Sequence, residues 1–209
     1  MPRPPSGTDV KLKAAGRRLI QEKGLTGFSL REACRLAGVN PAMFRYYFGS
    51  KDEFVKVVMK EMYDEFMLNF KAGVSAAGTP RERLKNALVE VGRFAQGIRK
   101  AAPMIFSDLA QGKKEAFGFF SANFTEHVGQ VALLAMECRS SSAVKGRTVP
   151  YMVAAMLPVM VFPVIVAGIL ERNGVDALAG TPFRKLSAEL FSGEGIAERA
   201  EIALRGVGL

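Results

Sequence analysis

The residues best suited to chemistry in this 209-residue chain lie in one short segment, between residues 29 and 51. Arg45 and Lys51 carry fixed positive charge, and Tyr46 and Tyr47 combine an apolar ring with a hydroxyl. Cations and hydroxyls gathered in this way are typical of contact with phosphate groups. An arginine can also read the edges of bases through its paired N–H donors. The segment therefore predicts binding to a polyanion.

Catalytic and metal-binding patterns are not found in the sequence. It contains no phosphate-binding glycine loop, no serine-hydrolase elbow and no zinc-protease helix motif. His127 is the single histidine, and Cys34 and Cys138 are too few for a metal cluster or a disulfide framework. We therefore predict a protein that is not an enzyme and that has no metal or cofactor. His127 is expected to be a surface or core residue, and the two cysteines to be small buried residues.

Positive charge is concentrated at the N-terminal end of the chain. The formal net charge is +9; residues 1–60 contain twelve Lys and Arg against five Asp and Glu, whereas residues 61–209 contain seventeen against fifteen. Contact with a polyanion is thus predicted for the first 60 residues. Charge alone leaves open an ordinary solvated surface. The rest of the chain is nearly neutral, and a hydrophobic content of 49% is enough for a sizeable core.

Helix signals divide this basic segment into short helices. Apolar residues at helical spacing predict a first helix, which Thr8 or Asp9 caps and Gly24 ends. Ser29 begins a second helix, because its side chain can accept a hydrogen bond from a free backbone N–H. Gly38 ends that helix, since glycine adopts the left-handed conformation of a C-terminal cap without strain.

A third helix follows at once, because Asn40 is a preferred N-cap and Pro41 suits the first helical position. Two short helices around a tight glycine turn form a helix-turn-helix unit, here about residues 29–48, whose second helix enters the major groove of DNA. Phe44 and Phe48 are four residues apart and are expected to face inward as its anchor. The candidate DNA contacts are Ser29, Asn40, Pro41, Ala42, Met43, Arg45, Tyr46, Tyr47 and Lys51.

Residues 29–54, SLREACRLAGVNPAMFRYYFGSKDEF, resemble the DNA-binding module of TetR-type transcriptional regulators. The features that carry the resemblance are the turn Ala37–Val39, the aromatic pair Tyr47–Phe48 and the helix start Gly49–Glu53. Arg45 departs from the pattern, because many members have a tyrosine at that position. The pattern therefore predicts the module but not the bases that it reads.

The resemblance implies an all-α protein with a helix-turn-helix head over residues 6–66 and a C-terminal effector-binding and dimerisation domain over residues 74–209. It further implies a cytoplasmic homodimer that pairs through about 149–170 and 183–206. Each recognition helix would bind one half-site of a near-palindromic operator in double-stranded DNA. Such regulators are typically repressors that a small ligand releases, and the apolar composition of this body points to an apolar ligand.

The C-terminal part is predicted to be helical throughout, with no strand. Expected helices cover about 80–101, 103–111, 113–138, 149–170 and 183–206. Adaptable methionine and phenylalanine side chains are candidates for an apolar ligand pocket, although at helical spacing such residues are also ordinary core. The candidates are Met104, Phe106, Phe117, Phe120, Phe124, Met156 and Met160.

Residues 149–170 contain no charge and are long enough to span a bilayer. The soluble interpretation is a helix buried on all sides, partly by a second subunit. Residues 1–9 contain no apolar run of signal-peptide length, so secretion is not predicted. We expect a cytoplasmic protein without a membrane anchor. Two alternatives stay open: a membrane-anchored DNA-binding protein that uses residues 149–170, and a regulator without a ligand.

Overall fold

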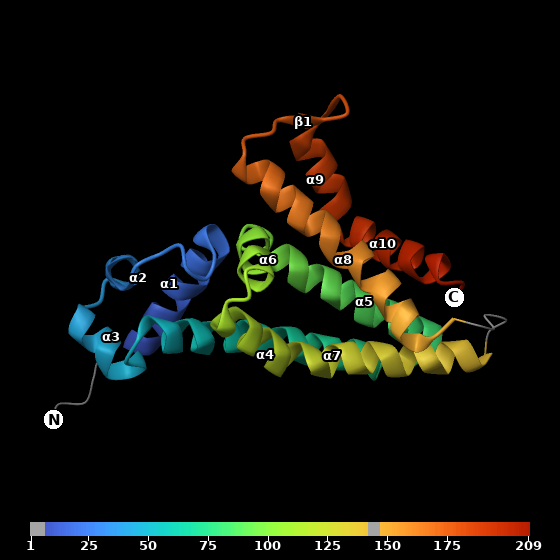
Figure 1. Ribbon diagram of the computed structural model, residues 1–209, viewed down its shortest axis with the longest axis horizontal. Helices are drawn as coiled ribbons and strands as arrows, with labels where there is room; N and C mark the ends of the chain where they lie inside the picture. Colours follow the sequence, from blue (N-terminus) through green and yellow to red (C-terminus); the bar gives the residue numbers. More distant parts are fainter. Residues whose placement is uncertain (1–6, 142–146) are drawn as a thin grey trace. The chain divides into compact units, whose positions relative to one another are not determined.

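The computed structural model describes residues 7–141 and 147–209, which are mostly helical (Figure 1). The helices, in chain order, are α1 (Thr8–Lys23), α2 (Leu30–Ala37), α3 (Pro41–Phe48), α4 (Lys51–Val74), α5 (Pro80–Gly97), α6 (Ala102–Ala110), α7 (Lys114–Ser141), α8 (Val149–Arg172), α9 (Phe183–Phe191) and α10 (Gly193–Gly206). The all-α fold class that the sequence predicts is confirmed, with the helix-turn-helix elements at the N-terminal end.

The chain packs into two compact units. The first combines the residues up to Glu65 with Lys100–Phe119, and the second combines Phe66–Arg99 with Phe120–Leu209. Both α4 and α7 contribute residues to each unit. The predicted domain division at residues 66–74 stays a prediction. Helix α6 falls in the first unit, although it follows that division in the sequence.

The first helix begins one residue earlier than a Thr8 cap would require. Gly7, with φ of 92°, is the N-cap, and Thr8 is already the first helical residue and only 8% exposed. The prediction that Thr8 or Asp9 caps this helix is therefore wrong: Thr8 faces the core, and Gly7 takes the N-cap position without a side-chain cap among the residues described from 7 onward. Gly24 ends the helix as predicted, and its N–H donates to the carbonyl of Ile20 at 2.9 Å.

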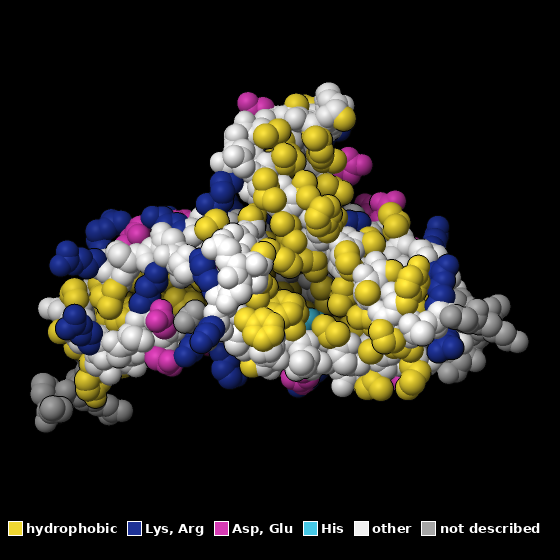
Figure 2. All heavy atoms as spheres, in the orientation of Figure 1, with side chains coloured by type: hydrophobic (Ala, Val, Ile, Leu, Met, Phe, Trp, Pro, Cys, Tyr) yellow, Lys and Arg dark blue, Asp and Glu magenta, His cyan; other side chains and the backbone are white. Residues whose placement is uncertain are grey.

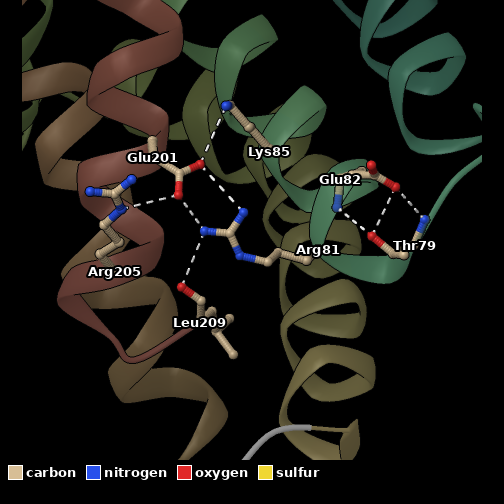
Figure 3. Close-up of polar contacts among 7 residues, drawn as sticks. All are labelled: Thr79, Arg81, Glu82, Lys85, Glu201, Arg205 and Leu209. Atoms are coloured by element: carbon tan, nitrogen blue, oxygen red, sulfur yellow. Dashed lines mark hydrogen bonds and ion pairs between the residues drawn. The ribbon is translucent and has the colours of Figure 1, made fainter.

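Thr79 begins α5 with a complete capping box (Figure 3). Its hydroxyl accepts from the N–H of Glu82 at 3.2 Å, and the Glu82 carboxylate accepts from the N–H of Thr79 at 2.7 Å. The helix ends at Gly97, short of the predicted residue 101. Pro103 lies in the first turn of the next helix, α6, where its missing N–H needs no partner.

The uncharged segment forms α8, which Thr148 caps and which runs through Pro158 and Pro163 without ending. Fully buried side chains of α5, α8 and α10 make the core of the second unit. They include Leu84, Leu88, Met152, Met156, Met160 and Leu204.

The predicted final helix is divided in two, and a small hairpin precedes it. Strands β1 (Ala177–Leu178) and β2 (Thr181–Pro182) pair antiparallel, which corrects the prediction of no strand. Two residues a strand are too few to show the alternation by which strands are recognised in a sequence. Ser192 separates α9 from α10, and its hydroxyl accepts from the N–H of Gly195 at 2.9 Å.

A polar network joins the first turns of α5 to α10 (Figure 3). The Glu201 carboxylate accepts hydrogen bonds from the Arg81 guanidinium, pairs with Lys85 at 3.3 Å and accepts from Arg205 at 3.2 Å. Arg81 also donates to the carbonyl of Leu209 at 3.3 Å. The hydrogen bond from Arg81 is the main reason why the pKa of Glu201 falls to about 2.

Candidate nucleic-acid interface

The helix-turn-helix geometry follows from the caps that the sequence places around it. The Ser29 hydroxyl accepts from the N–H of Glu32 at 3.2 Å and begins α2. Gly38 ends α2 with φ of 65°, the left-handed conformation expected there. The side-chain oxygen of Asn40 accepts from the N–H of Ala42 at 2.8 Å and begins α3. The predicted boundaries of both helices are therefore confirmed.

An aromatic cluster holds the inward-facing side of α3. Phe44 is fully buried, and its ring centroid lies 4.8 Å from that of Phe54 on α4. Phe48 is half-buried and also lies 4.8 Å from Phe54. At Gly16 of α1, a Cβ atom would meet the Phe54 ring at 2.4 Å, so glycine allows the ring to lie against that helix. The predicted inward orientation is confirmed for Phe44 and holds in part for Phe48.

The opposite side of α3 carries most of the predicted contact residues. Tyr46 is the most prominent at 65% exposed, and its ring meets that of Tyr47 edge-on at 5.3 Å. The other exposed candidates are Asn40, Pro41, Ala42 and Arg45. Met43 and Tyr47 are half-buried, and they lie at the border between this exposed surface and the aromatic cluster.

Lys51 is held within the first unit. Its ammonium group donates to the carbonyl of Thr26 at 3.0 Å and lies 4.7 Å from the centroid of the Phe28 ring. Burial lowers the pKa of Lys51 below its usual 10.5. The residue also lines a cavity of about 140 Å³ with Asp108 and Lys113, which form an ion pair. A phosphate at this site would compete with the Thr26 carbonyl for Lys51.

Two basic residues of α1 are engaged by acids of α4. Lys13 pairs with Glu61 at 2.6 Å, and Arg17 forms a two-pronged pair with Glu65, one hydrogen bond of which is 2.9 Å long. Their positive charge is partly neutralised, so α1 contributes less to a basic surface than its composition suggests.

The arginines of α2 and α3 differ from those of α1. Arg31, Arg35 and Arg45 are exposed, and within residues 7–141 and 147–209 none of them forms an ion pair with an acid. Figure 2 shows Lys and Arg side chains over this part of the chain. Sequence reasoning missed Arg31 and Arg35 as candidates, although their spacing of four residues places them on one side of α2.

The predicted ligand contacts are divided between the two units. In the first unit, Met104 packs where a Cβ of Gly24 would be, whereas Phe106 and Phe117 are 39% and 61% exposed. In the second unit, the rings of Phe120 and Phe124 stack at 3.7 Å. Met156 and Met160 are fully buried in α8.

His127 lies in the core of the second unit, 3% exposed. Its ring contacts Phe124 at 4.8 Å and Phe66 at 5.2 Å between centroids. Burial lowers the pKa of His127 to about 4, against the opposing effect of Glu126. At neutral pH the imidazole is therefore uncharged. Cys34 and Cys138 are buried free thiols, as predicted, and the described residues contain no cluster of three metal-ligating side chains.

Comparison with known proteins identifies the N-terminal module. A family model described as "Bacterial regulatory proteins, tetR family" matches residues 12–58, which span α1 to the start of α4. Residues 12–58 are therefore similar to the DNA-binding module of the TetR family. The HTH-type transcriptional regulator BetI of Rhizobium meliloti is 35% identical over 77 residues, which are 37% of each chain. The chain thus matches little more than a third of the length of that relative.

Solved structures extend the likeness of fold to nearly the whole chain. A TetR/AcrR regulator from Thermobifida fusca covers 95% of this chain and 97% of its own, with a TM-score of 0.62 and 18% identity. A Saccharomonospora viridis protein solved in complex with choline covers 96% of each chain, with a TM-score of 0.69 and 12% identity. At 18% and 12% identity these structures extend the shared fold beyond the N-terminal module.

Proposed function

We propose that this TetR-family protein is a cytoplasmic homodimer that binds a near-palindromic operator in double-stranded DNA and represses transcription until a small ligand releases it. The observation that carries the proposal is the construction of α3. Its exposed side presents Pro41, Ala42, Arg45 and Tyr46, while Phe44 fixes the opposite side in the core. A short helix whose inner side is fixed in the core and whose exposed side carries a guanidinium and a phenol suits insertion into the major groove.

Residues at the start of α3 are proposed to read bases. The side-chain oxygen of Asn40 is occupied by its own cap, which leaves its NH2 group as the donor for a base. Arg45 lies one turn later and can bind guanine through two N–H groups. Ala42 and Met43 supply apolar contacts of the kind that recognise a thymine methyl group.

Phosphate contacts are proposed around this reading surface. Arg31 and Arg35 of α2 add to Ser29 and Tyr46, since all four are exposed. Lys51 joins them only if it exchanges the Thr26 carbonyl for a phosphate oxygen. Such contacts fix the register of the protein on DNA without reading sequence.

The surface of α8 supports a dimer. Tyr151, Phe162 and Ile169 are 56%, 62% and 45% exposed, and their spacing of eleven and seven residues places them on one face of the helix. Ile202 of α10 adds a further side chain that is 54% exposed. Figure 2 shows hydrophobic side chains at the surface over α8 and α9. A second copy would cover this apolar face through a symmetric interface and would hold two α3 helices about 34 Å apart.

The second unit is proposed to hold the effector. Its adaptable side chains include the stacked Phe120 and Phe124, and the choline complex of a protein with the same fold supports binding of a small molecule. Because α4 begins beside α3 and continues to Val74, a movement of α4 would change the spacing of the two heads. A ligand achieves this only if it binds the free and the DNA-bound states with different affinity.

A membrane anchor is the second candidate, and α8 favours it by composition. It has 24 residues, a mean hydropathy of 2.6 in its most apolar window and one third of that window buried. The core helix of a soluble protein passes the same test, and Met152, Met156 and Met160 of α8 are fully buried in the second unit. Recovery of the protein in the soluble fraction without detergent would exclude the anchor.

Selection of bound DNA from a random pool tests the proposal and should yield a site with two-fold symmetry. On that site, Arg45→Ala should weaken binding by about 10- to 100-fold. Arg18→Ala is the matched control, because Arg18 is exposed and pairs with Glu22 on α1; its affinity should change little. A monomer that retards no DNA at low salt would contradict the proposal.

A further inference from the structure

Arg199 of α10 is a buried cation in the second unit. It is 6% exposed, and its guanidinium carbon lies 5.3 Å from the centroid of the Phe191 ring. Its Nη1 donates to the backbone carbonyl of Met160 at 3.4 Å. A guanidinium removed from water in this way is costly unless a negative charge compensates it.

The remaining donors of this guanidinium lack partners. Among the residues that the structure describes, Nε and Nη2 of Arg199 are buried and find no acceptor for their hydrogen bonds. These two N–H groups point from the same edge of the planar group. That edge is the one that binds both oxygens of a carboxylate side by side. The orphaned pair therefore has the geometry of a carboxylate-binding fork.

Other charged groups near Phe191 do not satisfy that fork. Arg99 lies 5.2 Å from the same ring and pairs with Glu171 at 2.9 Å, so the carboxylate is committed to Arg99. Nε of Arg99 and Oε2 of Glu171 are themselves buried without partners. Burial lowers the pKa of Arg199, yet a guanidinium keeps its proton in proteins. The surroundings of Phe191 thus hold two cations against one anion.

The space beside Arg199 is filled by the end of a methionine side chain. Gly92 of α5 lies next to it: a Cβ there would be 4.0 Å from Nη2 and only 2.8 Å from both Met160 Cε and Ile196 Cγ2. The absent side chain makes room for the end of Met160. A methionine end is flexible and repacks readily around an inserted apolar group.

We propose that Arg199 binds the carboxylate of a small organic acid, whose apolar part packs in place of the end of Met160. This inference deepens the proposed function, on which it rests, because it names the polar group of the effector. The proposed ligand is a free organic acid. A carboxylate from a second copy of the chain, or water alone, would give the other outcomes of the test.

Calorimetry and thermal unfolding of the full-length protein without DNA provide the test. The probes are decanoate and phenylacetate, with decan-1-ol as the uncharged counterpart of decanoate and choline as a cation. At least one acid should bind and raise Tm with concentration, whereas decan-1-ol should bind at least tenfold more weakly. Arg199→Met should weaken acid binding by about 10- to 100-fold, because it removes two charge-assisted hydrogen bonds. Arg199→Lys keeps the charge but loses the paired N–H donors, so its affinity for the acid should lie between those of the wild type and Arg199→Met.

Arg184→Met is the matched control, since Arg184 is an exposed arginine of α9 and the substitution is the same. It should bind the acid as the wild type does. Unliganded Arg199→Met should be as stable as the wild type or more so, because a buried charge without its counterion is removed.

Three outcomes would overturn the proposal. They are binding of neither acid to the wild type, equal binding of decanoate by Arg199→Met, and choline binding that the acids do not match. Sedimentation distinguishes the other source: if Arg199→Met dissociates a wild-type dimer, the carboxylate belongs to the second copy. Binding of the wild type to DNA is measured in a separate experiment. A failure of the proposed DNA-binding function can therefore be distinguished from a failure to bind the acid.

Discussion

Helix α3 of the first unit and helix α8 of the second are fixed in their cores by different kinds of side chain. In the first unit, the rings of Phe44, Phe48 and Phe54 interlock, and Gly16 gives Phe54 its place. In the second, α8 contributes methionines such as Met160, whose side chains are long and unbranched. Aromatic rings have few conformations and specific contacts, whereas methionines adapt to their surroundings.

The difference matches the task proposed for each unit. A helix that reads DNA must be held in one orientation, because a small displacement removes its contacts with the bases. A body that responds to a ligand needs alternative packings of similar free energy. The contrast between α3 and α8 teaches that the choice of core side chain can make one helix rigidly held and another adaptable within the same chain.

The strongest way to break the contrast is to remove the ring that locks the first unit. Phe54→Ala should lower the free energy of unfolding by about 3–5 kcal/mol, because Phe54 is fully buried and three elements meet at its ring. Thermal or urea unfolding measures the loss, and DNA binding should fall with it. Phe117→Ala is the control, since Phe117 belongs to the same unit but is 61% exposed. If both variants lose the same amount of unfolding free energy, the aromatic cluster does not stabilise the first unit more than an exposed ring does.

A second test concerns the one titratable ring within the core of the second unit. His127 is neutral when folded, with a pKa of about 4 against 6.5 for the unfolded chain. Between these values the unfolded state binds the extra proton, so stability falls as the pH falls from about 6.5 to 4. The loss should approach roughly 3 kcal/mol at the lower limit.

His127→Gln, which cannot titrate, separates this effect from that of other groups. The difference in unfolding free energy between wild type and variant should change steadily from pH 7 to pH 4. Above pH 7 it should be constant, because His127 is uncharged in both states there. A difference that is independent of pH over the whole range would show that the imidazole is not buried in its neutral form.

How much of this could be predicted from the sequence differs between the units for a physical reason. The helices of the head are set by contacts over a few residues, such as Ser29 with Glu32 and Asn40 with Ala42. Caps, prolines and glycines report such local contacts directly. The confirmed helix boundaries and the buried position of Phe44 follow from them, whereas the partly buried Phe48 depends on packing.

Long-range pairs could not be predicted in the same way. The ion pair of Arg17 with Glu65, and the contact of Lys51 with Thr26, join residues that are far apart in the sequence. No pattern of residue spacing predicts these two contacts. Both reduce the positive charge that the N-terminal helices can offer to DNA. The burial of Arg199 could not be predicted either, because helical periodicity shows only that the residue lies in α10. The DNA contacts themselves stay predictions.

The smallest of the expected effects sharpens the comparison at the polar network of the second unit (Figure 3). Glu201 forms ion pairs with Arg81, Lys85 and Arg205, and its pKa of about 2 lies below the usual 4.5. Its stabilising effect is therefore complete above about pH 4.5 and is lost as the pH falls towards 2. Glu201→Gln should cost about 1–2 kcal/mol at pH 7, a modest figure because the side chain is still 19% exposed.

Glu198→Gln is the matched control for this network, because Glu198 is an exposed glutamate on the same helix. The two variants should differ in unfolding free energy at pH 7 and converge towards pH 2, where Glu201 becomes protonated in the folded protein. High salt should reduce the difference only in part, since Arg81 binds Glu201 through hydrogen bonds as well as charge. If salt abolished it, the network would be an ordinary surface pairing, and the second unit would depend on its apolar packing alone.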